Sequence, residues 1–481
     1  MQLISFTFFV FWGILFFLYY KSPKIQWQLL LIASFVFYWI CAGKLPFVLI
    51  GCTSIAYIYG RLLKKGLCSV VYLWGCIGLQ LLLLIMCRSF NNLGYGATLG
   101  VSFFVLSAIG YCVDIHREKY PAEHSFFKLL LGISFFPSII QGPINRYDML
   151  SEQLFHQHDF SWDHLYKGIQ RFVWGTMKIL VIVPRLGIIV NEVYANLPEA
   201  EGFAVMAGTA CFAIQLYADF SGYMDMVTGV GETFGIKITE NFNRPFFSAS
   251  VSEFWRRWHI SLGTWFKDYV LYSIVMSNVG RKINKRVKRY NKQYGKIAST
   301  LLGTMIVWVL TGLWHSNSKG YLIWGIYYGI LMCCSLARES CQGKKEKGRY
   351  QQTRIYRLFC IARTWCIVLI ADVFIETDSF GAAMKCIGKL FRIDQYQIGN
   401  VFRIVRASSF VRTDTVVLAI ALLLWFLVSI LQEKGYGIRE WISKQRLPVR
   451  WMIWYALVFA VIWYGKYGAE YDVSVFMYQG Y

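Results

Sequence analysis

The chain of 481 residues is strongly hydrophobic and strongly basic: 56% of its residues are hydrophobic, 18% are aromatic, and the formal net charge is +22. A mean hydropathy of +0.44, with apolar runs along the whole length, excludes an ordinary soluble domain. The sequence predicts an all-α polytopic transmembrane bundle with re-entrant or interfacial helices, because helices satisfy backbone hydrogen bonds internally in lipid. Residues 1–481 are expected to form one membrane domain.

About eleven or twelve segments approach the roughly 20 residues needed to cross a bilayer. They are residues 3–20, 27–42, 44–60, 69–87, 98–115, 166–195, 203–232, 298–314, 320–337, 357–375, 415–432 and 449–468. Leu3–Tyr20 lacks a basic leading region and an Ala-x-Ala-type cleavage site, so we expect a retained membrane helix rather than a signal peptide. Leu129–Ile140 contains Pro137 and favours a re-entrant or interfacial segment instead of a full crossing.

Basic residues concentrate in a few loops, which the positive-inside rule places in the cytoplasm. These loops are residues 21–24, 61–65, 116–128, 281–289, 338–357 and 433–450. If the twelve segments cross the cell membrane one after another and these loops are cytoplasmic, the N-terminus is predicted to be extracellular. The basic loops are expected to attract anionic lipid or an acidic carrier protein, and nucleic acid is not an expected partner.

Metal binding is not expected. Most of the thirteen cysteines lie inside apolar runs, where Cys behaves as a small hydrophobic residue. The sequence contains no Cys-x-x-Cys pair and no His-x-x-x-His pair, which are the spacings typical of zinc sites.

The polar turn Thr311–Ser318 separates the apolar segments 297–310 and 321–336, and it places His315 near the tip of a predicted helical hairpin. Cytoplasmic loops on both sides of this hairpin predict that its tip faces away from the cytoplasm. An ionisable group at membrane depth is costly and indicates a functional site. The alternative is a buried histidine satisfied by two hydrogen bonds.

A second polar stretch covers residues 241–247 and 253–269. On one continuous helix, Trp255, His259, Leu262 and Phe266 would share a face. An interfacial amphipathic helix explains most of this pattern, although it does not explain a histidine within the aromatic face.

Two further stretches carry polar or helix-breaking residues. Residues 135–146 contain two prolines and a glycine, and broken backbone at membrane depth is tolerated where it is buried in protein or lines a cavity. We therefore expect this stretch to line a path. Asp219 and Asp225 lie six residues apart on different helix faces, which favours bonded partners over an acid–base pair.

These motifs carry a family resemblance over roughly residues 90–480. The motifs are Phe-Phe-Pro…Gly-Pro-Ile-x-Arg (135–146), Asp-Phe-Ser-Gly-Tyr-x-Asp (219–225), Glu-Asn-Phe-Asn-Arg-Pro-Phe (240–246), Phe-Trp-Arg-Arg-Trp-His-Ile-Ser-Leu (254–262) and Leu-Thr-Gly-Leu-Trp-His (310–315). The chain resembles the membrane-bound O-acyltransferase family and, within it, the bacterial alginate O-acetyltransferase branch. That branch is similar to the D-alanine transferases of teichoic acids.

The resemblance implies that His315 is the catalytic histidine and His259 the second histidine of the site. The residues expected to bind substrate are Trp255, Arg256, Trp314, Pro137, Gly142 and Asn243. The chain departs from the family after Trp314-His315, where Ser316-Asn317 replaces Gly-Ala, and at Tyr328-Gly329, which replaces His-Gly. The Pro-Leu-Gly-Gly that the family places after its Arg-Asp-Tyr-like string is also missing.

The expected reaction is acyl transfer, most simply of an acetyl group, from a cytoplasmic thioester to a hydroxyl of an extracellular polysaccharide or a partner protein. His315 would act as general base, and the absence of a Gly-x-Ser-x-Gly motif favours direct transfer. No bound cofactor is expected; acyl-coenzyme A or an acyl carrier protein would be the co-substrate. The alternatives are D-alanyl transfer to teichoic acid, a transporter, and a non-enzymatic scaffold of a polymer-export complex.

Overall fold

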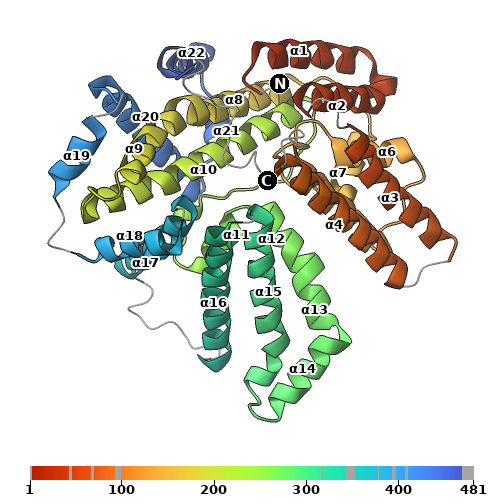
Figure 1. Cartoon of the computed structure of the whole chain (residues 1–481). Helices are drawn as coiled ribbons and strands as arrows, with labels where there is room; N and C mark the ends of the chain where they lie inside the picture. The colour runs from red at the N-terminus through yellow and green to blue at the C-terminus, as the bar shows by residue number, and fades with distance from the viewer. Residues whose placement is uncertain are drawn as a thin grey trace. The chain divides into compact units, whose positions relative to one another are not determined.

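The structure is a computed structural model that describes residues 3–42, 46–66, 70–92, 99–316, 318–342, 353–377, 379–392, 397–406 and 410–467. Within these ranges the regular elements are all helical (Figure 1). The first helices are α1 (Phe6–Lys21), α2 (Gln26–Ala42), α3 (Pro46–Lys64), α4 (Val70–Asn92), α5 (Val101–His116), α6 (Phe126–Ser134), α7 (Tyr147–Leu154), α8 (Trp162–Met177), α9 (Val183–Ala195) and α10 (Gly202–Thr233). The later ones are α11 (Val251–Arg257), α12 (Ile260–Phe266), α13 (Tyr272–Met276), α14 (Asn278–Lys288), α15 (Ala298–His315), α16 (Lys319–Gln342), α17 (Arg354–Glu376), α18 (Phe380–Leu390), α19 (Ile398–Arg406), α20 (Arg412–Glu433), α21 (Ile438–Ser443) and α22 (Leu447–Tyr464).

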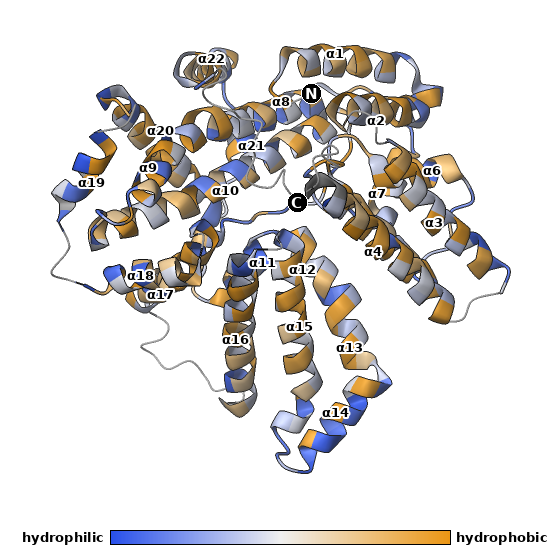
Figure 2. Ribbon diagram, viewed as in Figure 1, coloured by the Kyte–Doolittle hydropathy of each residue, from blue (hydrophilic) through white to orange (hydrophobic). Residues whose placement is uncertain are grey.

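The described residues contain ten helical segments that are long and apolar enough to span a membrane. Two shorter apolar helices, α1 and α5, account for the remaining segments expected from the sequence. Each of the twelve predicted segments therefore overlaps a helical segment, and residues 166–195 cover both α8 and α9. The prediction of an all-α polytopic membrane protein is confirmed. Figure 2 shows hydrophobic residues along most of α15 and α16, whereas α14 is largely hydrophilic.

The chain divides into two compact units. Unit 1 comprises Met1–Ile179, Asp219–Glu240 and Trp451–Tyr481, and unit 2 comprises Leu180–Ala218 and Asn241–Arg450. The expectation of a single membrane domain stays a prediction.

In unit 1, α8 packs closely against the second half of α10 through glycines. A Cβ atom on Gly175 would lie 2.4 Å from the carbonyl oxygen of Gly222, and one on Gly168 would lie 2.6 Å from that of Gly229. Membrane helices lack a hydrophobic drive to associate, so small residues that allow close backbone approach stabilise such pairs.

The same helix pair confirms that Asp225 is bonded to partners. Its carboxylate lies 3.0 Å from Nε of Arg171 and 2.7 Å from Nζ of Lys178. Arg171 also binds Glu240, with a nitrogen–oxygen distance of 2.6 Å. Asp225 is thus a structural counter-ion for two cations in unit 1, as its depth in an apolar run predicts.

The predicted helix break in residues 135–146 is also present in unit 1. α6 ends at Ser134, a series of turns follows, and residues 135–143 are buried. The N–H of Gly142 donates to the carbonyl of Ser138 at 3.0 Å, and a Cβ on Gly142 would lie 2.2 Å from the Cα of Ser138. The broken backbone is therefore enclosed by protein, as membrane depth requires.

Unit 2 contains a tight hairpin of α15 and α16, which run side by side in Figure 1. Elsewhere in unit 2, a hydrophobic core that includes Val193, Ala204, Val373 and Ala383 joins α9, α10, α17 and α18. The start of α20 is fixed to α9 by the pair of Arg185 Nε and Asp414 Oδ1 at 2.9 Å.

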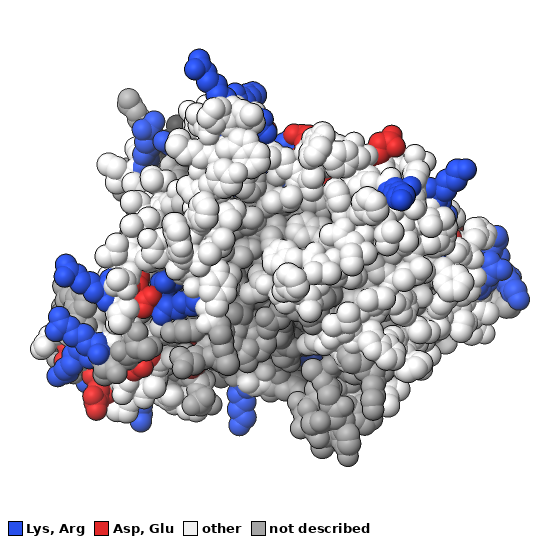
Figure 3. All heavy atoms as spheres, turned by 90° about the horizontal axis from the view of Figure 1, so that it is seen from above, with Lys and Arg blue, Asp and Glu red and all other residues white. Residues whose placement is uncertain are grey.

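Charged side chains form separate groups on the surface. On the face seen in Figure 3, most of the area carries neither Lys, Arg, Asp nor Glu, and Lys and Arg outnumber the acidic residues.

Candidate active site

His315 lies at the last residue of α15, where the tight hairpin holds it in place. Gly312 and Gly325 lie opposite each other on α15 and α16: a Cβ on Gly312 would be 2.5 Å from the carbonyl oxygen of Tyr321, and one on Gly325 would be 2.5 Å from that of Trp308. The prediction of a helical hairpin ending at His315 is confirmed, and the imidazole is only 4% exposed.

His259 lies at a break between two short helices. α11 ends at Arg257 and α12 begins at Ile260, so the prediction that Trp255, His259, Leu262 and Phe266 share one face of a continuous helix is wrong. His259 has φ 45° and ψ 52°, which is the left-handed region that costs a non-glycine residue about 1–3 kcal/mol.

Hydrogen bonds from the preceding segment explain this conformation. The N–H of Ile260 donates to the carbonyl of Asn241 at 3.0 Å, and the N–H of Ser261 donates to Oδ1 of Asn241 at 2.9 Å. On the other side of His259, the N–H of Asn243 donates to the carbonyl of Arg257 at 2.9 Å. We call these three bonds the Asn241 clamp. They replace the helical hydrogen bonds of residues 257–261, and His259 takes the left-handed conformation at this break between the two helices.

The Asn241 clamp and the hairpin bring the two histidines close together within unit 2. The ring centroids of His259 and His315 are 6.4 Å apart. Trp314 contacts both rings, with centroid distances of 6.0 Å to His259 and 4.8 Å to His315. Both imidazoles are buried. His259, Trp314 and His315, which were predicted to belong to one site, therefore lie together in the structure.

An aromatic cluster forms the wall next to His315. The imidazole is stacked on Tyr321 at 5.6 Å and lies edge-on to Trp324, also at 5.6 Å. Trp324 in turn contacts Trp255 at 5.4 Å and Tyr328 at 5.1 Å. These rings form an apolar wall, and a wall that keeps water away strengthens the polar interactions that a reacting group makes beside it.

The electrostatic environment favours a neutral His259. Burial, together with the nearby His315, holds the pKa of His259 well below its usual value of 6.5. A neutral imidazole can accept a proton through a ring nitrogen, and two adjacent imidazoles in an aromatic enclosure suit proton transfer at a substrate hydroxyl.

This low pKa predicts a dependence of stability on pH. Below roughly pH 6.5 the unfolded chain binds a proton at His259 that the folded chain does not bind, so stability is lost as the pH falls toward the folded-state pKa. The loss is expected to approach about 1.4 kcal/mol per pH unit in that window. Unfolding of the purified protein in detergent at pH 7 and pH 5 measures it, with His259→Asn as the comparison.

Asparagine tolerates the left-handed conformation and does not titrate, so His259→Asn should show a smaller loss between the two pH values than the unsubstituted protein. An identical loss in both proteins would contradict the assignment of a low pKa to His259.

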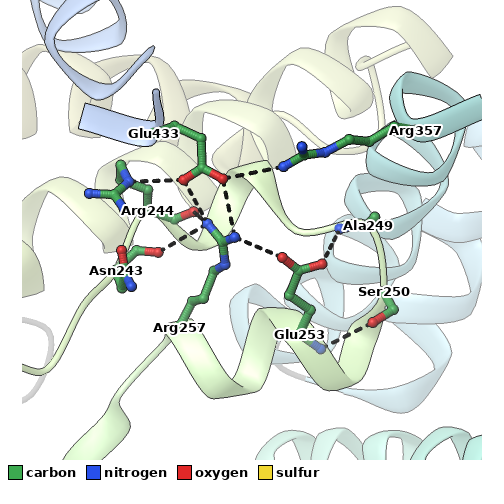
Figure 4. Close-up of polar contacts among 8 residues, drawn as sticks. All are labelled: Asn243, Arg244, Ala249, Ser250, Glu253, Arg257, Arg357 and Glu433. Carbon is green, nitrogen blue, oxygen red and sulfur yellow. Dashed lines mark hydrogen bonds and ion pairs between the residues drawn. The ribbon is translucent and has the colours of Figure 1, made fainter. Parts of the chain in front are cut away.

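The remaining predicted residues of this unit lie near the surface. Arg256 and Asn243 are exposed, whereas the neighbouring Arg257 is half-buried and donates to Glu433 and Glu253 (Figure 4). Sequence reasoning missed Glu433 because it stands at the end of a distant helix, where it was counted with a basic loop. Asn241 was not assigned to the site either, although it lies in the 240–246 motif, two residues before the predicted site residue Asn243. Its place in that motif was the signal that could have identified it.

The chain is similar in sequence to several known proteins. The chain is 31% identical over 328 residues to a probable alginate O-acetylase of Pseudomonas syringae pv. tomato, a match covering 68% of this chain and 58% of the relative. It is 27% identical over 421 residues to a probable alginate O-acetylase of Pseudomonas fluorescens, covering 85% and 79%. It is 31% identical over 242 residues to a teichoic acid D-alanyltransferase of Bacillus subtilis, covering 49% and 58%. No protein-family model matches the chain.

The chain belongs to the membrane-bound O-acyltransferase family. The match spans little more than half the length of the first of these relatives. Among the family features, Tyr328 stands where the motif has a histidine, and its ring is 1% exposed and stacked on Trp308 at 5.2 Å. In this chain Tyr328 is therefore part of the aromatic cluster beside His315.

Two other predicted site residues, Pro137 and Gly142, belong to unit 1. Both are in the buried break after α6, and their expected role in lining a substrate path stays a prediction. Within the described ranges, no group of three or more His, Cys, Asp or Glu residues is arranged to hold a metal ion.

Proposed function

We propose that the protein is an O-acyltransferase of the cell membrane, which moves an acyl group from a cytoplasmic thioester to a hydroxyl of an extracellular polysaccharide or a partner protein. The observation that carries this proposal is the pair of buried histidines, 6.4 Å apart, at the end of the α15–α16 hairpin. Membership of the family and the functions of the relatives support it.

His315 is the general base in this proposal. It accepts the proton of the acceptor hydroxyl as the oxygen attacks the thioester carbonyl, the carbon–sulfur bond breaks, and the proton passes to the departing thiolate. The products are an ester and a thiol. Such base catalysis contributes about 10²–10⁴-fold to a rate. The donor is acyl-coenzyme A or an acyl carrier protein, with the basic cytoplasmic loops available to attract its anionic groups.

A hydrogen-bond donor for the acyl oxygen is also available. The indole Nε1 of Trp255 is buried, and it has no hydrogen-bond partner among the residues that the structure describes. Trp255 contacts Trp324, which contacts His315. We assign to this N–H the stabilisation of the developing oxyanion, an interaction that strengthens in a water-excluding site.

The acyl group is acetyl in our proposal, as the names of the alginate O-acetylases suggest, with D-alanyl as the second candidate because of the teichoic acid D-alanyltransferase. Mass analysis of surface polymers from cells with and without the gene tests this. Loss of acetyl esters that returns on complementation supports acetyl transfer, loss of D-alanyl esters supports the second candidate, and unchanged polymers contradict both.

The proposed orientation makes a labelling prediction. A membrane-impermeant thiol reagent applied to intact cells should label a cysteine introduced at Glu199 and should not label one at Lys285, because the basic loop is expected in the cytoplasm. Both positions are exposed, so burial does not mask either result. Lysed cells, in which both sites should react, are the control. Labelling at 285 from outside would reverse the orientation and place the hairpin tip in the cytoplasm.

A further inference from the structure

Three arginines in unit 2 converge on a single carboxylate at the end of α20 (Figure 4). Glu433 accepts from Nε of Arg244 at 2.9 Å and from the two terminal nitrogens of Arg257 at 2.8 and 3.1 Å. Arg357 reaches the other side of the carboxylate at 3.3 Å. We call these four residues the Glu433 cluster.

The three arginines of the Glu433 cluster depend on the charge of one carboxylate. The side chain of Glu433 is 16% exposed and that of Arg257 is 18% exposed, so both are shielded from much of the solvent. Glu253 provides a second carboxylate to Arg257 at 2.8 Å. Without Glu433, Arg257 would keep Glu253, but Arg244 would lose the carboxylate that it shares with Arg257. Two partly buried guanidinium groups would then face each other, and unpaired like charges in such a place repel.

The same arginines are part of the segments that determine the position of His259. Arg257 contributes the carbonyl of the Asn241 clamp, and its guanidinium also contacts the carbonyls of Asn243 and Arg244 at 3.5 Å (Figure 4). Arg244 and His259 are two of the three non-glycine residues with positive φ among the described residues. A strained conformation persists only where its surroundings over-determine it, and here the surroundings are the Asn241 clamp and the Glu433 cluster.

We propose that Glu433 is a positioning residue for His259: its carboxylate holds Arg244 and Arg257, and through them the Asn241 clamp that fixes the left-handed turn at the site. This inference rests on the proposed function for its kinetic consequence, whereas the mechanical link does not depend on activity. Glu433 does not contact the histidines, so it acts on the geometry of the site and not on the reacting atoms.

The kinetic test replaces Glu433 with glutamine, which keeps the shape and removes the charge. Glu433→Gln is expected to lower kcat about 10- to 100-fold, because small displacements in a site have effects of that size. The KM for the thioester should stay within about twofold. Glu433→Asp, which keeps the charge, should recover part of kcat. Glu440→Gln removes an exposed carboxylate on the nearby α21 and should change neither constant.

A second test measures how firmly the Asn241 clamp holds the backbone, independently of activity. Ser261 is 2% exposed, and its N–H is held by Asn241. A cysteine at position 261 should react slowly with an alkylating reagent, as followed by peptide mass spectrometry, and several-fold faster when Glu433→Gln is added. Glu440→Gln should not accelerate it. A wild-type melting temperature for Glu433→Gln would show that the change is local.

The two measurements distinguish the positioning role of Glu433 from the proposed transferase function. Faster alkylation in Glu433→Gln, with no transferase activity in the unsubstituted protein towards any donor tested, would support the link to the Asn241 clamp and contradict the proposed function. Unchanged alkylation, or a rise in KM in place of a fall in kcat, would overturn the positioning role of Glu433.

Discussion

Replacing His315 with alanine is expected to lower ester formation by at least about 100-fold, because the variant lacks the proposed general base. The protein should remain inserted and folded: the imidazole is at the end of α15, and the glycine contacts that join α15 to α16 do not involve it. The rate of acyl transfer by purified protein, and the ester content of surface polymers, measure the effect.

His124→Ala is the matched control, because His124 is an exposed histidine of unit 1. It should leave transfer unchanged. Near-normal acylation by His315→Ala would remove His315 from the mechanism and favour the scaffold alternative, since a scaffold of an export complex does not need an imidazole at this position.

Gly312→Leu is expected to cause the largest loss of stability. A Cβ at residue 312 would lie 2.5 Å from the carbonyl oxygen of Tyr321, and that oxygen belongs to the backbone of the opposite helix. The helices must separate to accept a side chain, and overpacking of this kind costs about 3 kcal/mol. Because His315 is three residues further along α15, transfer activity should also fall.

Unfolding of the detergent-solubilised protein measures this loss. Gly325→Leu tests the same contact from the opposite helix and should have a similar effect, since its Cβ would lie 2.5 Å from the carbonyl oxygen of Trp308. At Gly381 on α18, no heavy atom of the described residues lies within 4 Å of an added Cβ, so Gly381→Leu should leave stability unchanged. Equal stability of all three variants would show that close packing of the hairpin is not required.

The length of the apolar segments predicted the helices of this protein well, because a membrane permits few alternatives to a helix. The His315 hairpin could be predicted for the same reason: a polar turn between two apolar segments has one simple solution. The continuous helix over residues 253–269 was wrong because its backbone bonds to residues 241–243, which lie outside any helical repeat. Periodicity reports local helix propensity and contains no information about such a partner.

The candidate site was predictable to a different degree at each residue. His259, Trp314 and His315 could be proposed from their motifs, and the structure places them in contact. Glu433 could not, because its partners are 176 and 189 residues away along the chain and its local sequence resembles an ordinary helix end. Long-range ion pairs leave no periodic pattern in a single sequence.

Transfer across a sealed bilayer tests the central claim most directly. Purified protein is reconstituted in oriented proteoliposomes, with radiolabelled acetyl-coenzyme A on the cytoplasmic side and an alginate oligosaccharide on the other. We predict labelled ester on the oligosaccharide with the unsubstituted protein and a loss of at least about 100-fold with His315→Ala. Ester formation only when both substrates are on the cytoplasmic side, or equal transfer by the His315→Ala protein, would contradict a His315-dependent transfer of acyl groups across the membrane.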